Sequence, residues 1–210
     1  MKQRPLLPLA DYQRIYQVIY SVLEATGIAR THRACIVFAS AGMMILREHY
    51  KLEASLSVGS MALMVGEKAA NVAVYGREID GEWVYDANGF HAWVECDGWL
   101  IDFMAPIMAR ALKEDGAPFD VPRKMLQKPL AERKDHPRAI QHEGEFFAFS
   151  DAALAEQLLD TQTVQFEDIL NVCLAWFRKP PRPLPPLSLG ATGLDPKPLV
   201  LHAPAIIGSW

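Results

Sequence analysis

The sequence predicts an α+β fold, and three observations support that prediction. Apolar residues recur with helical spacing near the N-terminus, several consecutive β-like runs with tight turns follow, and helical spacing returns later in the chain. Consecutive strands joined by short turns form an antiparallel sheet, and helices that are separated from the strands in sequence pack on such a sheet.

The composition limits the class of protein. The chain has 210 residues, of which 50% are hydrophobic and 22% charged, and its formal net charge is −4. Such a length allows one large core, and the acidic balance does not favour nucleic acid or an anionic membrane as a partner. Pro5 and Pro8 interrupt the short apolar run near the N-terminus, and no run of about 18 apolar residues follows. Three widely spaced cysteines do not resemble a disulfide framework, so we expect a cytoplasmic protein.

Two helices are predicted before the strands. The first covers residues 11–26, with Asp11 suited to cap it and Gly27 suited to end it. The second covers residues 31–50. Its central part, residues 34–46, has no formal charge and is apolar on all sides, which is typical of a helix buried all round.

The strands are predicted from runs of β-favouring residues. Gly59 and Gly76 interrupt two of these runs, and a tight turn at Asn88-Gly89 leads into the last segment. The runs cover residues 55–65, 71–79, 82–87 and 89–103.

The last segment is predicted to be a hairpin that turns at Asp97-Gly98, a two-residue sequence that tolerates positive φ. With this turn, His91 and Asp102 lie on one face as diagonal neighbours, with Cβ atoms about 7 Å apart or less. Cys96 falls on the opposite face, because side chains alternate along a strand.

The remainder of the chain completes the predicted organisation. Residues 104–145 mix basic and acidic side chains and are expected to form solvated surface. Residues 150–178 have the spacing of two helices. We expect a single domain over residues 1–179 and a proline-rich extension, residues 180–210, that packs on it.

Cys35 is the candidate nucleophile. A cysteine in an apolar helix is usually a small hydrophobic residue. However, Cys35 is near the helix start, where the helix dipole favours a thiolate, and His32 and Arg33 add positive charge nearby. His91 and Asp102 follow as a base and its orienting acid. Cys173 is on an apolar helical stripe and is expected in the core.

Several assignments around His91 stay open. A two-residue turn at Asn88-Gly89 would place Asp86 directly opposite His91, so Asp86 competes with Asp102 as the orienting acid. His32 is interpreted as a residue at the rim of the site. Trp93 and Trp83 are candidate walls of a substrate site, although core packing is their usual role.

The order Cys35, His91, Asp102, with the runs H-A-W-V-E and W-L-I-D, resembles the papain-like cysteine-enzyme superfamily. The resemblance is greatest to its transglutaminase-like and arylamine N-acetyltransferase-like branches. It covers residues 31–103, and we expect a bacterial family of that fold. Around the cysteine the chain reads only R-A-C-I, where papain-type enzymes have a cysteine- and tryptophan-rich signature.

The resemblance implies a papain-like core and a Cys-His-Asp triad that transfers acyl groups through a thioester. The substrate would be a small molecule or peptide with an amide, ester or thioester carbonyl, and no cofactor or metal is implied. Two alternatives remain. The first is a non-catalytic domain that binds a peptide or amide on the same fold. The second is a metal site formed by Cys35, His91 and Asp102, against which the absence of C-x-x-C and H-x-x-x-H pairs counts.

Overall fold

The computed structural model describes residues 4–27, 30–68, 71–80, 82–190 and 195–210 and has an α+β architecture with a largely antiparallel sheet. The helices are α1 (Leu9–Thr26), α2 (Cys35–Ile45), α3 (Met108–Glu114), α4 (Ala152–Asp160) and α5 (Val164–Trp176). Short helical turns are η1 (Thr31–Arg33), η2 (Leu46–Tyr50), η3 (Ala105–Ile107), η4 (Leu130–Glu132) and η5 (Pro137–Ala139). The strands are β1 (Ala54–Met64), β2 (Val72–Tyr75), β3 (Arg77–Ile79), β4 (Glu82–Val84), β5 (His91–Cys96), β6 (Trp99–Asp102), β7 (Lys124–Pro129), β8 (Phe146–Ser150), β9 (Ser188–Leu189), β10 (Lys197–Pro198) and β11 (Gly208–Ser209).

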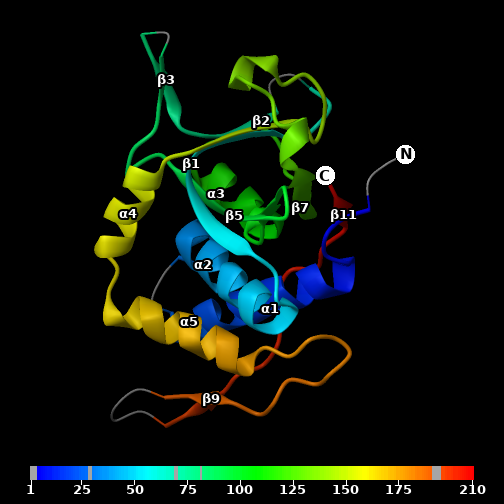
Figure 1. Cartoon of the computed structure of the whole chain (residues 1–210), viewed down its shortest axis with the longest axis vertical. Helices are drawn as coiled ribbons and strands as arrows, with labels where there is room; N and C mark the ends of the chain where they lie inside the picture. The colour runs from blue at the N-terminus through cyan, green and yellow to red at the C-terminus, as the bar shows by residue number, and fades with distance from the viewer. Residues whose placement is uncertain (1–3, 28–29, 69–70, 81, 191–194) are drawn as a thin grey trace.

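Helix α2 is the centre of the helical layer. It packs against β5 of the sheet and against α1 and α5 (Figure 1). Nine of its eleven residues are buried, as its continuous apolar composition predicts. The chain continues through η2 to Tyr50, so the predicted extent of the second helix is confirmed, while its first turn is the separate helical turn η1.

The sheet has apolar side chains on both faces. Ala92, Val94 and Ile101 belong to the core shared with α1, α2 and α5. Trp93 and Leu100, which alternate with them, belong to a second core on the other face. Both faces are therefore covered, and polar groups that lie in this sheet need partners within the protein.

The hairpin of β5 and β6 has the predicted register. Cys96 is opposite Trp99, and Asp97 and Gly98 have φ values of 48° and 77°. Two consecutive residues with positive φ form the mirror-image turn whose twist suits a tight hairpin.

The region from Val72 to Gly89 differs from the prediction. The expected strand over residues 71–79 is divided at Gly76, which has φ 133°. Beyond it, β3 and β4 pair only with each other within the described residues and project as a separate arm (Figure 1). The tight turn before the hairpin is also one residue earlier than expected, because Asp86 and Gly89 pair across it.

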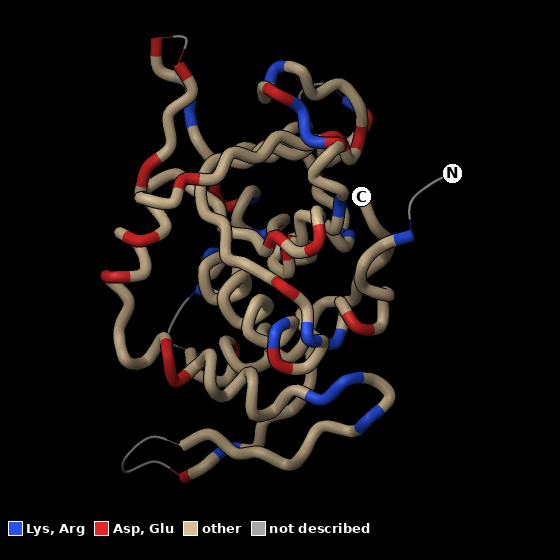
Figure 2. Tube along the Cα trace, viewed as in Figure 1, with Lys and Arg blue, Asp and Glu red and all other residues tan. Residues whose placement is uncertain are grey.

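The chain after β6 contributes more to the sheet than predicted. Strand β7, inside the segment expected to be solvated surface, pairs with β6, and β8 pairs with β1. Basic and acidic residues of this segment are interspersed on the outer loops, as Figure 2 shows.

The C-terminal segment packs along α1 and returns to the sheet. His202 donates its backbone N–H to the Ser21 hydroxyl (2.9 Å), and that hydroxyl donates to the His202 carbonyl (2.8 Å). Strand β11 then pairs in parallel with β7. No helix among the described residues is long and apolar enough to cross a lipid bilayer.

Candidate active site

The site lies where two strands meet end to end along one edge of β1. Gly59 of β1 is opposite His91 on one side and Ser150 of β8 on the other. Met61, two residues later, is opposite Tyr75 of β2 and, on the β8 side, Ala148. Since β8 pairs with the other edge of β1 from Gly59 to Leu63, β5 and β2 share one edge, and the end of β2 meets the start of β5. The intervening chain leaves the sheet as the β3–β4 arm.

His91 and Asp102 are hydrogen-bonded at this junction. The His91 Nε2 atom is 2.9 Å from Asp102 Oδ2, and the two side chains are 0% and 1% exposed. The second carboxylate oxygen accepts the backbone N–H of Met104 at 2.8 Å. Because a carboxylate only accepts hydrogen bonds, His91 Nε2 carries the proton of the first bond. The predicted contact between these residues is therefore present.

The surroundings favour a protonated His91. Burial alone lowers the pKa of an imidazole, but the charge and hydrogen bond of Asp102, together with the nearby Cys35 side chain, raise the pKa of His91 to about 10. The ring therefore retains its second proton at neutral pH, and this proton is on Nδ1. Among the described residues Nδ1 has no hydrogen-bond partner of normal geometry.

Cys35 approaches His91 from the helical layer. It is the first residue of α2, where backbone N–H groups have no acceptor within the helix, and it is 7% exposed. Its side chain contributes to the electrostatics of His91, and both residues line a cavity of about 540 Å³. Tyr75 and Phe90 line the same cavity, which also reaches Asp115 of the helix α3 end.

Tyr75 is a site residue that the sequence interpretation missed. Its ring stacks on the His91 imidazole, with centroids 4.2 Å apart and planes at 21°. The Ser60 hydroxyl donates to the Tyr75 carbonyl at 2.8 Å and accepts a hydrogen bond from the Trp83 indole N–H. The position of Tyr75 just before Gly76, at a strand end, is the signal in the sequence, but only the pairing with β1 brings it to His91.

Asp86, the rival acid, does not hold His91. It lies outside any strand that pairs with β5 and binds Arg77 instead, with Arg77 Nη2 at 2.5 Å from Asp86 Oδ2. Arg77 and the backbone N–H of Asn88 keep the pKa of Asp86 below its usual value. The alternative assignment fails because β4 pairs with β3 and not with the histidine strand.

The two tryptophans are not walls of this cavity. Trp93 is 1% exposed and packs in the second core, with its indole N–H on Glu95 Oε1 at 3.0 Å. Trp83 is on the arm, where it packs edge-on against Phe147 and holds Ser60. Their usual role as packing residues applies, and Trp83 supports the site through Ser60.

His32 is also placed differently from the prediction. It is 3% exposed and therefore not a rim residue, and its Nε2 is 2.8 Å from Glu114 Oε2. Glu114 is thereby kept at a pKa below its usual value. His32 lines both the cavity of Cys35 and a second cavity.

The two other cysteines are in apolar surroundings. Cys96 and Cys173 are buried, and burial raises the pKa of Cys96 to about 11 and that of Cys173 further. A thiol with a raised pKa is a poor nucleophile at neutral pH. Within the described residues there is no group of three or more His, Cys, Asp or Glu side chains arranged to hold a metal ion.

Comparisons with known proteins place the chain in a family but assign no reaction. A family model described as "Protein of unknown function (DUF2026)" matches residues 8–210. A solved structure described as "The crystal structure of genomics APC5867" is similar, with a TM-score of 0.83 and 32% sequence identity. The match covers 99% of this chain and 98% of that chain. No curated protein matches.

Proposed function

The chain belongs to the DUF2026 family, and we propose that it is a thiol-dependent acyl hydrolase or acyl transferase with Cys35, His91 and Asp102 as its catalytic residues. The observation that carries the proposal is a fully buried His–Asp pair in a cavity that also contains Cys35, a cysteine at a helix start whose side chain interacts with His91. A buried ionisable pair is costly to maintain, and perturbed groups of this kind concentrate at functional sites.

We also propose that the fold is papain-like, in the sense of the transglutaminase-like branch. Two features support this. The cysteine is the first residue of the helix that packs against the sheet, and the histidine and aspartate are on the neighbouring antiparallel strands β5 and β6. The chain order of the three residues is the order in that superfamily.

In the proposed first half-reaction, Cys35 attacks the substrate carbonyl carbon as a thiolate, while its proton is held on His91 Nδ1. The C=O π electrons move to oxygen, and the backbone N–H of Cys35 stabilises the oxyanion. The bond to the leaving group then breaks, and His91 returns the proton to the departing amine, alcohol or thiol. Cys35 is left as a thioester.

In the second half-reaction, water or an amine enters the cavity of about 540 Å³ and attacks the thioester carbonyl. His91 takes a proton from this nucleophile and keeps it, and the carbon–sulfur bond breaks so that Cys35 departs as a thiolate. Asp102 fixes the ring orientation through Nε2, so that Nδ1 performs every proton transfer. Tyr75 holds the imidazole from one face by stacking. The entering nucleophile decides between hydrolysis and transfer.

The test is intact-mass analysis of the protein after exposure to p-nitrophenyl acetate and to a small acyl thioester, followed by peptide mapping. We expect one acyl group, on Cys35. The adduct should be absent in Cys35→Ser and retained in Cys96→Ser, which removes a buried thiol of the same hairpin as His91. Preferential acylation of Cys96 or Cys173 contradicts the proposal.

Limited alkylation with iodoacetamide at neutral pH provides a second measurement that needs no substrate. We expect Cys35 to react first of the three cysteines. If the protein binds amide or peptide ligands while Cys35 forms no acyl adduct and shows no preferential alkylation, the non-catalytic binding domain replaces the enzyme.

A further inference from the structure

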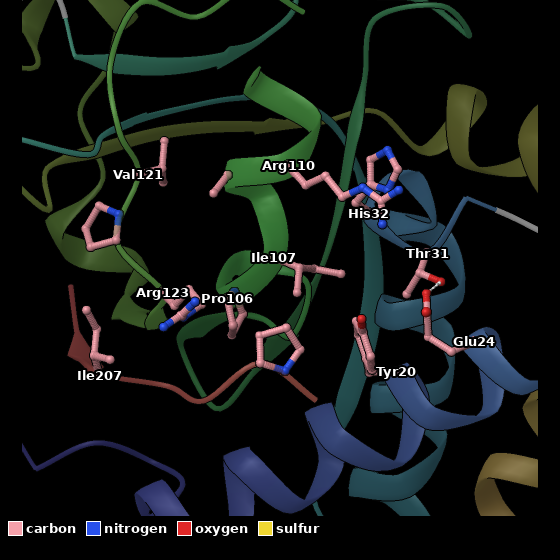
Figure 3. A pocket seen from close by; sticks show the side chains of 13 residues that line it. Tyr20, Glu24, Thr31, His32, Pro106, Ile107, Arg110, Val121, Arg123 and Ile207 are labelled. Atoms are coloured by element: carbon pink, nitrogen blue, oxygen red, sulfur yellow. Dashed lines mark hydrogen bonds between the residues drawn. The ribbon is translucent and has the colours of Figure 1, made fainter. Parts of the chain in front are cut away.

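A second cavity of about 420 Å³ (Figure 3) has one wall residue, His32, in common with the cavity of the candidate active site. Its walls come from α1, η1, the η3–α3 segment, residues 121–123 and the C-terminal segment. A volume of this size is within the range of small-molecule sites. The proposed acyl transfer makes no use of this cavity.

The lining combines apolar surface with two guanidinium groups. Tyr20 contributes an aromatic ring, and Arg110 and Arg123 contribute positive charge. Most of the other lining residues are apolar, namely Pro106, Ile107, Ala109, Val121, Pro122, Pro204 and Ile207. Such a lining suits a ligand with an apolar body and one charged end.

The charge around Glu114, an acid paired with the cavity residues His32 and Arg110, is unbalanced. The carboxylate of Glu114 is shared by Arg30 (3.8 Å), Arg33 (3.7 Å) and Arg110 (3.5 Å), in addition to His32. Asp115 pairs with Arg33, and Glu24, the acid that lines the cavity, accepts the Thr31 hydroxyl at 2.5 Å. Around Glu114, three arginines (Arg30, Arg33 and Arg110) therefore face two carboxylates (Glu114 and Asp115). The excess charge is positive and favours an anionic ligand group.

His32 provides an independent indication of a ligand. Its side chain is 4% exposed, and Nε2 donates to Glu114, but Nδ1 is buried and has no hydrogen-bond partner among the described residues. An unsatisfied buried nitrogen is costly, and native structures contain few of them. A ligand group in the cavity can supply the missing hydrogen bond.

The remaining walls are held in place by backbone contacts. Arg123 donates its Nε–H to the Ala205 carbonyl at 3.1 Å, and Ile207 donates its backbone N–H to the Arg123 carbonyl at 2.9 Å. The arginine is therefore positioned by the C-terminal segment, which itself forms one wall. The site is largely formed before a ligand arrives, which reduces the entropy cost of binding.

We propose that this cavity is a second ligand site, which takes a small molecule with an apolar body and one carboxylate or phosphate group that binds Arg110 beside His32 (Figure 3). The inference rests on the lining of this cavity and does not depend on chemistry at Cys35.

The experiment is a titration of the full chain, labelled at its methyl groups, with benzoate, phenyl phosphate, benzamide and inorganic phosphate, followed by NMR. We expect saturable shifts at Ile107, Val121 and Ile207 with benzoate or phenyl phosphate. The relative affinity of those two probes identifies the anionic group. Benzamide has the shape of benzoate without its charge, and inorganic phosphate has the charge without the apolar body, so both should bind at least about ten-fold more weakly.

Variants locate the site and separate this inference from the proposed function. Arg110→Gln should weaken benzoate or phenyl phosphate by about ten-fold. The matched control is Arg133→Gln, an exposed arginine that does not line the cavity, and it should change nothing. Cys35→Ser should bind the probes as the wild type does, whatever it does to acyl transfer. Equal affinity for benzamide and benzoate, shifts confined to other methyl groups, or no saturable binding by either anion overturns the inference.

Discussion

The two ends of strand β5 are built differently. At the Cys96 end the chain turns through Asp97 and Gly98 into β6, pairing continues without a break, and Cys96 and Trp99 are buried. At the His91 end, one edge of β1 pairs first with β5 and then with β2. His91 and Tyr75 are in contact at the gap between the ends of these two strands.

This difference shows where a covered sheet has room for chemistry. Along continuous pairing, the apolar side chains of β5 pack in one of the two cores, namely Ala92, Val94 and Cys96 in the first and Trp93 in the second. At the gap the chain departs as the β3–β4 arm, and the space left beside the sheet is a cavity. This arrangement buries the charged pair of His91 and Asp102, which is unfavourable. The hydrogen bonds to both carboxylate oxygens of Asp102 offset this cost.

The largest expected effect distinguishes Cys35, which lies at the His91 end of β5, from Cys96 at the other end. Cys35→Ser should reduce acyl-transfer turnover by about a thousand-fold or more, because a hydroxyl lacks the readily formed anion of a thiol. Cys96→Ser should leave turnover of the folded protein unchanged. Initial rates with p-nitrophenyl acetate measure both, and thermal unfolding monitors the fold. Equal losses of turnover in Cys35→Ser and Cys96→Ser would contradict the assignment of catalysis to the His91 end of β5.

The next effect concerns the acid that holds His91. Asp102→Asn should lower turnover by about a hundred-fold or more, because the amide can favour the wrong imidazole tautomer. Circular dichroism should show an intact fold. If turnover is retained, the proton transfers do not need an oriented ring.

The same variant has a consequence for stability against pH. The folded pKa of His91, about 10, is above its ordinary value of 6.5, so protonated His91 stabilises the fold fully below about pH 6.5. This stabilisation should disappear as the pH rises towards 10 in the wild type and should be much smaller in Asp102→Asn. Urea unfolding at a series of pH values measures the difference. If the free energy of unfolding depends on pH in the same way in both proteins, His91 and Asp102 are not ionised as described.

A residue in the middle of β5 should affect stability alone. Trp93→Ala removes a fully buried indole and should lower the free energy of unfolding by about 3–5 kcal/mol. Below the lowered melting temperature, Cys35 should still be the first cysteine to be alkylated. A normal melting temperature would show that the indole is not packed as the structure has it.

The smallest effects compare a glycine at each end. Gly98→Ala should cost about 1 kcal/mol, since a Cβ there meets nothing within 4 Å and only the φ of 77° opposes it. Gly76→Ala should cost about 2 kcal/mol or more, because φ is 133° and the new Cβ would be 2.8 Å from Ser60 Oγ. Only Gly76→Ala should also reduce turnover, by displacing Tyr75. Denaturant unfolding and initial rates decide whether the two ends differ in this way.

Local features explain which parts of the fold were predictable. The hairpin register follows from Asp97-Gly98 and the alternation around it, and the contact between His91 and Asp102 follows from the register. The position of Cys35 at a helix start also depends on local sequence. The proposed grouping of these residues could therefore be formulated without a structure.

Features that depend on pairing between distant segments were not predictable. The sequence could not indicate that β4 pairs with β3, which is why Asp86 competed with Asp102. Strand β7 (Lys124–Pro129) was not predicted, because Lys124, Lys128 and the charged chain around them are typical of solvated surface. The tryptophans were misplaced because apolar character alone does not distinguish a cavity wall from a core.

The gap beside β1 also bears on how the chain folds. Cys35, Tyr75, His91 and Asp102 come from four different elements, and they meet only after β1 has paired with both β2 and β5. Contacts between distant segments of this kind form late, because their loops must close first. A partly folded chain therefore carries an ordinary thiol at Cys35 with no base beside it. The rate at which Cys35 gains its reactivity during refolding should report the completion of the sheet, without any added probe of structure.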